Sequence, residues 1–201
     1  AVIEKLLATC LYEHRLVDVR DRALLLVAFA SGGRRRAEVA GLRVEDLVRD
    51  APVPRDPADP DSPMVAKITI RLGRTKTTTA EDDARVVVIG RAATALLDWM
   101  ALAKIETGAV FRCIDRWGRL GATALDPQSV NAILKARCAR AGLDPALFSA
   151  HGLRSGFMTE AGKQGVPLPE AMQLSQHRSV QQAARYYNEA EIDKGKAVRL
   201  I

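Results

Sequence analysis

Two adjacent tyrosines near the end of the chain, Tyr186 and Tyr187, carry hydroxyl groups that could act as nucleophiles. His177 precedes the first of them by nine residues, and a His-x-x-Arg string places His151 and Arg154 further upstream. Arginine can donate two hydrogen bonds to a phosphate and stays protonated. Tyrosine needs a positive environment and a proton acceptor to attack at neutral pH. These residue types together are suited to phosphoryl transfer.

Helix periodicity distinguishes the two tyrosines. Val180, Ala183, Ala184 and Tyr187 follow the i, i+3, i+4, i+7 spacing of a stripe that faces a core. Tyr186 lies about 100° around the helix from Tyr187, off that stripe. We therefore expect Tyr187 to be buried and Tyr186 to present its hydroxyl to a phosphate.

Two basic strings lie upstream. Residues 32–38 read GGRRRAE, which sets three arginines at a predicted helix start with a carboxylate one turn beyond; the structural alternative is a solvated cap or a basic localisation signal. Residues 73–77 read GRTKT and place Lys76 between two predicted strands. A lysine at such a position is usually only a solubilising charge.

These four strings, in this order from Gly32 to Tyr187, resemble the catalytic boxes of the tyrosine recombinases of the phage integrase family. The resemblance implies a site-specific DNA recombinase or integrase and the catalytic-domain fold of that family. It also implies six catalytic residues, which are Arg35, Lys76, His151, Arg154, His177 and Tyr186.

The roles implied by the resemblance follow the needs of the reaction. Arg35 and Arg154 would clamp the phosphate oxygens, with a third hydrogen bond from His177. His151 would accept the tyrosine proton, and Lys76 would protonate the departing 5′-hydroxyl. The products would be a 3′-phosphotyrosyl link and a free 5′-hydroxyl, which another strand can rejoin without ATP, metal or cofactor.

The chain departs from the family pattern at two positions beside these boxes. Arg34 stands where the family usually has leucine, so an assignment shifted by one residue from Arg35 is the alternative. Gln176 stands where a glycine usually precedes the histidine. Glu38, one helical turn from Arg35, is expected to orient the catalytic cations rather than to contact DNA.

The composition fits a polyanionic partner. With 30 Lys and Arg against 24 Asp and Glu, the 201-residue chain has a net charge of +6 and a pI near 9.5. Aromatic residues make up only 4%, which disfavours an RNA-binding module that stacks bases. Three widely spaced cysteines suggest neither disulfides nor zinc, and the longest apolar run, residues 23–30, is too short to span a membrane. We expect a cytoplasmic, nucleoid-associated protein.

The expected partner is double-stranded DNA, on which the full-length enzyme would form a homotetramer at paired sites, with no small-molecule substrate and no membrane. Residues 188–201 are the expected C-terminal segment exchanged between subunits, and the family's N-terminal core-binding domain is expected to be absent from this chain. Type IB topoisomerase activity, telomere resolution and an inactive DNA-binding accessory domain are the alternatives.

The elements that must position these residues are mostly helical. The pattern predicts helices over 2–15, 20–31, 36–42, 92–104, from 127, and again from 149 with a break at 165–167. Short strands are predicted over 65–72 and 85–89, and the proline-rich residues 51–63 are expected to form an exposed loop. We therefore expect residues 1–201 to be one catalytic domain, mainly α with a small antiparallel β-sheet (α+β).

Overall fold

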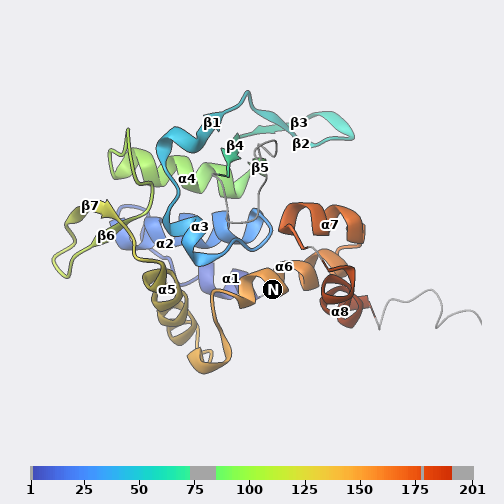
Figure 1. The fold of residues 1–201 in the computed structure, drawn as a ribbon. Coiled ribbons are helices and arrows are strands. Elements are labelled where there is room, and N and C mark those ends of the chain that lie inside the picture. Colours follow the sequence, from blue (N-terminus) through green and yellow to red (C-terminus); the bar gives the residue numbers. More distant parts are fainter. Residues whose placement is uncertain (1, 73–84, 178, 192–201) are drawn as a thin grey trace, which may run out of the picture.

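The computed structural model describes residues 2–72, 85–177 and 179–191 (Figure 1). The α-helices are α1 (Val2–Leu7), α2 (Leu16–Ala30), α3 (Arg36–Ala40), α4 (Arg91–Leu102), α5 (Pro127–Arg140), α6 (Gly152–Lys163), α7 (Leu168–Ser175) and α8 (Val180–Glu191). The strands are β1 (Leu47–Arg49), β2 (Val53–Asp56), β3 (Asp59–Val65), β4 (Lys67–Arg71), β5 (Arg85–Ile89), β6 (Arg112–Ile114) and β7 (Leu120–Ala124). The mainly helical α+β class is confirmed. No helix within the described ranges combines the length and apolarity that a bilayer crossing requires.

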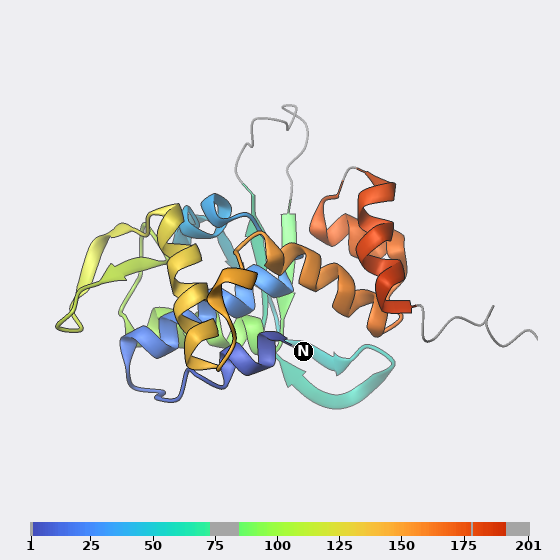
Figure 2. The same cartoon turned by 90° about the horizontal axis from the view of Figure 1, so that it is seen from below.

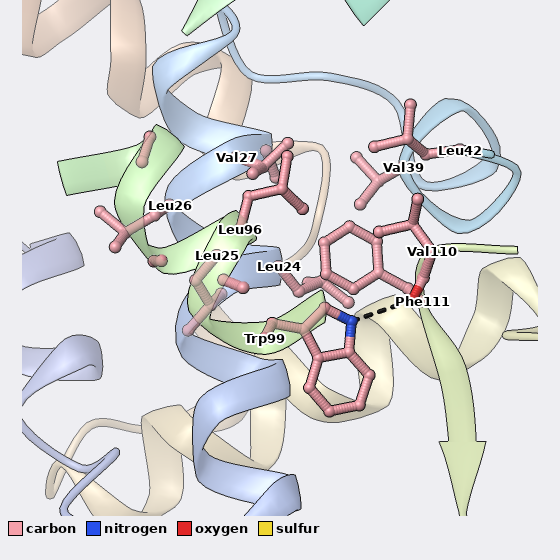
Figure 3. Close-up of a cluster of buried hydrophobic side chains, with 14 of the residues drawn as sticks. Leu24, Leu25, Leu26, Val27, Val39, Leu42, Leu96, Trp99, Val110 and Phe111 are labelled. Atoms are coloured by element: carbon pink, nitrogen blue, oxygen red, sulfur yellow. Dashed lines mark hydrogen bonds between the residues drawn. The ribbon is translucent and has the colours of Figure 1, made fainter. Parts of the chain in front are cut away.

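The main core surrounds α2, in which residues 23–28 are all buried. A helix segment that is apolar on all sides needs packing partners on several sides. Figure 3 shows Leu24 of α2 in one cluster with Trp99 of α4 and Phe111. The indole N–H of Trp99 donates to the carbonyl of Val110 at 2.9 Å, so the polar atom of this fully buried ring has a partner.

A three-stranded antiparallel sheet in the order β1-β4-β5 contributes to the same core. Ile68 and Ile70 of β4 and Val86 and Val88 of β5 are buried, with the period of two that was predicted for these strands. The predicted hairpin is therefore confirmed. Strand β1 was not predicted, because three residues carry too little periodicity to be recognised.

The expectation of a loop over residues 51–63 is wrong. Strands β2 and β3 form a two-stranded antiparallel hairpin, which Figure 2 shows projecting from the body of the molecule. Pro54 lies in this hairpin and pairs with Met64, followed by a register shift. Proline is tolerated because both strands of a two-stranded ribbon are edge strands, in which every second N–H position points away from the partner strand.

Two further expectations need correction. The predicted first helix, over 2–15, ends at Leu7, and α2 begins at Leu16 rather than at residue 20. The short hairpin of β6 and β7 was not predicted.

The start signal for α5 is confirmed, because the Asp126 carboxylate accepts from the N–H of Gln128 at 2.7 Å and Pro127 occupies the first turn.

A buried ionic cluster fixes α5 against α2. Arg137 is 1% exposed and donates to Asp18 at 2.7 Å and to Asp21 at 2.7 Å and 2.9 Å. It also donates to the carbonyl of Thr9 at 2.7 Å. Arg20, also buried, donates to the other oxygen of Asp21 at 2.8 Å, so two arginines face two carboxylates. All four charges are hydrogen-bonded, which is the condition under which ions are tolerated in a protein interior.

The last three helices pack on one another around a second, smaller cluster of buried side chains. Its buried members are Met158, Ala161, Ala171, Ala183 and Tyr187. The predicted break at 165–167 is confirmed, since α6 ends at Lys163 and α7 begins at Leu168. Figures 1 and 2 both show α7 and α8 beside α6, at the end of the molecule away from β6 and β7.

Candidate active site

The turn between α2 and α3 lies directly against the backbone of the C-terminal helices. Gly32 and Gly33 have φ of +88° and +71°. A Cβ on Gly33 would lie 2.2 Å from the Cα of Arg154, and one on Gly32 would lie 2.4 Å from the carbonyl oxygen of Leu174. Only glycine combines this φ with such a close approach. The glycine pair thus brings the start of α3 next to α6 and the end of α7.

Arg35 is the N-cap residue of α3 and is exposed, as the arginine string predicted for a helix start. Its backbone N–H donates to the Glu38 carboxylate at 3.3 Å, so Glu38 holds the first turn of α3. Arg35 is close enough to Arg154 that its positive charge, after burial, lowers the pKa of the Arg154 guanidinium, whereas Glu38 raises it. Glu38 therefore lies near these cations, and its role in orienting them stays a prediction.

The three consecutive arginines have different environments. Arg34 is 5% exposed and donates to the carbonyls of Ser31 at 2.8 Å and Leu174 at 2.7 Å, and to the side chain of Gln176 at 2.9 Å. Burial lowers the pKa of Arg34. The exposed Arg36 instead donates to Gln128 at 2.7 Å. The buried guanidinium of Arg34 is already hydrogen-bonded to other residues of the protein. This favours Arg35 as the arginine that is available to a ligand.

His151, Arg154 and His177 meet at the start of α6. His151 is the exposed N-cap residue of α6, and Arg154 lies one turn into the helix, as their three-residue spacing predicted. The Nε–H of Arg154 donates to Nε2 of His177 at 3.3 Å. Burial lowers the pKa of His177, and the charges of Arg154 and His151 lower it further. Two strings 23 residues apart therefore form one cluster.

Ser175 supports His177 from the other side. Its hydroxyl lies 2.7 Å from Nδ1 of His177, and it also lies 3.3 Å from the carbonyl of Met172. Because Nε2 accepts from Arg154, the neutral imidazole carries its proton on Nδ1. The Nδ1–H group then donates a hydrogen bond to the Ser175 hydroxyl oxygen. Sequence reasoning missed Ser175; the available signal was a hydroxyl residue two positions before the histidine.

Gln176, at the position where glycine was expected, adopts the left-handed conformation with φ of 54° and ψ of 40°. Its N–H donates to the carbonyl of Gln173 at 3.3 Å and so closes the end of α7. A non-glycine residue in this conformation costs about 1 to 2 kcal/mol. The turn keeps the shape that a glycine would give it, and the side chain is held by Arg34.

The two tyrosines differ as helix phase predicted. Tyr187 is buried in the second cluster, and its hydroxyl donates to the carbonyl of Val166. Tyr186 is half-buried, and among the described residues its hydroxyl has no hydrogen-bond partner; its carbonyl accepts from Thr159 at 3.5 Å. The expected stripe is wrong at Val180, which is 60% exposed because it lies at the first turn of α8, before the helix reaches its partners.

Two expectations fall outside the described residues. Lys76 lies within residues 73–84, between β4 and β5, and is not described. Of the expected exchange segment at 188–201, residues 188–191 belong to α8 and the remainder is not described. The structure therefore brings together Arg35, His151, Arg154 and His177. It places Tyr186 on α8, the helix that packs against α6.

The cluster lies on an open surface. A hollow of about 1180 Å³ lies elsewhere, between α2 and α4, and none of its lining residues belongs to the cluster. An open, cationic surface suits a large anionic partner better than an enclosed small molecule. Within the part of the chain that the structure describes, no group of three or more His, Cys, Asp or Glu residues is arranged to hold a metal ion.

Comparison with known proteins identifies the relatives of this fold and sequence. The sequence profile of the phage integrase family matches residues 1–192. The chain is 32% identical over 193 residues to an integrase/recombinase XerD homologue from Selenomonas ruminantium, covering 96% of this chain and 54% of that protein. It therefore spans about half the length of this relative.

Solved structures of recombinases share the fold. XerH bound to a palindromic difH substrate, in a post-cleavage complex, superposes with a TM-score of 0.67 at 17% identity, covering 98% of this chain and 51% of XerH. XerA superposes with a TM-score of 0.65 at 17% identity, covering 99% of this chain and 62% of XerA.

Proposed function

Because the chain belongs to the phage integrase family and is a tyrosine recombinase catalytic domain, we propose that it cleaves and rejoins DNA through Tyr186 in site-specific recombination. The observation that carries the proposal is the contact between Arg154 and His177 beside the turn that presents Arg35. Arg35, Arg154 and His177 come from three separate segments and lie near one another there on an open surface. Such convergence is what one phosphodiester requires.

The proposed phosphate site works by neutralising charge. A phosphodiester is already an anion, and attack by tyrosine adds negative charge to its non-bridging oxygens. Arg35 and Arg154 provide fixed positive charge without a proton to lose. His177 adds a hydrogen bond from Nε2 once that nitrogen carries a proton, and the approaching phosphate favours this form because an anion raises the pKa of a neighbouring imidazole.

Ser175 allows His177 to serve in both forms. The Ser175 hydroxyl oxygen accepts a hydrogen bond from the Nδ1–H of neutral His177, with Oγ and Nδ1 2.7 Å apart. When Nε2 is also protonated, the same Nδ1–H donation continues, so the ring keeps its orientation while its second nitrogen turns from acceptor to donor. His177 can therefore release Arg154 and bind a phosphate oxygen without moving from its pocket.

In the proposed reaction, the Tyr186 oxygen forms a bond to phosphorus and the bond to the 5′-oxygen breaks. The tyrosine proton passes to His151, and the leaving oxygen takes a proton from Lys76. The 3′-phosphotyrosyl link conserves the bond energy, so a 5′-hydroxyl of another strand can reverse the step without ATP. We propose DNA as the partner in the cytoplasm and a homotetramer on paired sites as the active form of the full-length enzyme.

The experiment that tests the proposal is covalent trapping on nicked suicide duplexes, selected by binding from a random DNA library at low salt. A denaturing gel then separates protein joined to DNA from free protein. We expect an adduct with the parent, loss of adduct with Tyr186→Phe, and retention of adduct with Tyr187→Phe. Adduct that survives in Tyr186→Phe would refute the assignment of the nucleophile.

A further inference from the structure

The two positions at which the chain departs from the family pattern contact each other. Arg34 Nη1 donates to Gln176 Oε1 at 2.9 Å, although the residues are 142 positions apart. Arg34 directly precedes Arg35, and Gln176 directly precedes His177. One hydrogen bond therefore joins the two backbone segments that present these proposed phosphate ligands.

We propose that Arg34 and Gln176 are a coupled pair of positioning residues, a proposal that rests on the function proposed above. The pair holds Arg35 and His177 in the relative positions that let both bind the same phosphate. The pair is a substitute for the leucine and glycine that the family pattern has at these positions. Arg34 acts on the site through its contacts with the protein and not by touching DNA.

The contacts of Arg34 explain why it positions rather than binds substrate. Its Nε–H is held by the carbonyl of Ser31, before the glycine turn, and its Nη2 by the carbonyl of Leu174, in the last turn of α7. Its Nη1 also lies 3.8 Å from the Glu38 carboxylate. A cation at a helix C-terminus is stabilised by the helix dipole and by the carbonyls that lack intrahelical partners. All three nitrogens of the Arg34 guanidinium therefore donate to protein groups.

Gln176 needs this partner because of its backbone. Glycine enters the left-handed region freely, whereas glutamine does so at a cost, and its long side chain has several rotamers. The hydrogen bond from the buried Arg34 selects one of them and keeps the left-handed turn that aims His177 at Arg154. Without Arg34, Gln176 can relax toward an ordinary φ and turn His177 away.

A double-mutant cycle tests the coupling, with Arg34→Leu, Gln176→Gly and the double variant in the full chain. The first measurement is the rate of covalent trapping in a single turnover, with DNA affinity measured separately. We expect Arg34→Leu to slow trapping about 10- to 100-fold with less than about a 3-fold change in affinity, as for loss of a residue that orients catalytic groups. The double variant should recover to within about 3-fold of the parent, because leucine and glycine need no mutual contact.

The second measurement is the titration of His177 by NMR, which does not depend on activity. Arg34→Leu should move the pKa of His177 back toward its ordinary value as the contact with Arg154 loosens, and the double variant should restore it. The matched control is Ile3→Val, in the buried face of α1, which should lower stability without changing the trapping rate or the titration.

The outcomes separate the two proposals. If the parent forms no adduct while Arg34→Leu shifts the titration and the double variant restores it, the proposed function fails and the positioning pair stands. If the parent forms adduct and Arg34→Leu behaves like Ile3→Val, the positioning pair is refuted. An equal loss of trapping from Arg34→Leu in the parent and in the Gln176→Gly variant would refute it as well, since it would show that the two residues act independently.

Discussion

The guanidinium of Arg154 donates to the imidazole of His177 at 3.3 Å. The two proposed phosphate ligands are therefore hydrogen-bonded to each other. The contact keeps Nε2 of His177 unprotonated and holds both side chains at one place. An anion entering between them would compete for the Arg154 donor and attract a proton to His177. If the site binds a phosphate as proposed, its two ligands are held together before the phosphate arrives, and binding is coupled to protonation of His177.

We expect acidification to destabilise the unbound protein through His177. Burial and the Arg154 charge lower the pKa of His177 in the folded state, so the unfolded state binds the proton more readily. Well above the ordinary histidine pKa of about 6.5, His177 is neutral in both states and does not affect the free energy of unfolding. As the pH falls from about 6.5 to the lower pKa of His177 in the folded protein, the unfolded state takes up the proton first and stability is lost. Urea unfolding of the parent and His177→Gln between about pH 7.5 and pH 5.5 measures the effect. Equal pH slopes in the two proteins would contradict it.

Gly33→Ala should destabilise the protein strongly. The added Cβ would lie 2.2 Å from the Cα of Arg154 at a φ of +71°, so overpacking and the left-handed backbone together cost about 3 kcal/mol. Gly118→Ala is the matched control, because Gly118 has a φ of +82° but open space around its Cβ, and should cost about 1 kcal/mol. Thermal unfolding of both compares the two effects, and similar losses would show that close approach to α6 is unimportant.

Arg137→Leu should cost about 3 to 5 kcal/mol, because it removes the buried cation of Asp18 and one of the two arginines that pair with Asp21, which keeps only Arg20. Arg140→Leu should cost less than about 0.5 kcal/mol. Arg140 lies on the same helix and reaches Asp18 at 4.0 Å, but its side chain is 51% exposed. Denaturant unfolding provides the free energies, and a loss for Arg137→Leu no larger than for Arg140→Leu would show that the cluster does not stabilise the fold.

DNA binding should weaken steeply as salt increases, because neutralising phosphates releases counterions. Arg35→Ala should make the slope of log affinity against log salt shallower by about 0.9, the contribution of one phosphate contact. Arg91→Ala is the control, since the Arg91 side chain is paired with Glu4 at 2.8 Å and lies away from the cluster. A flat salt response of the parent would count against DNA as the partner.

Local patterns predicted those parts of the fold that depend on neighbouring residues. The apolar run of α2, the Asp126-Pro127 helix start and the burial of Tyr187 all follow from helix periodicity and capping, and the structure confirms them. The β2 and β3 hairpin was missed because proline content excludes a central strand but not an isolated ribbon. Helix ends near residues 7 and 16 were missed because periodicity does not locate boundaries.

The sequence by itself determined the family and which of the two tyrosines is buried, and it supplied the prediction that Tyr186 is the nucleophile, because motif spacing and helix phase are properties of the chain alone. Only the tertiary structure decided what the neighbouring residues do. Arg34 and Gln176 read as two unrelated departures until the fold placed them 2.9 Å apart. A hydrogen bond between residues 142 positions apart depends on how α7 packs against the glycine turn, and no local pattern contains that information.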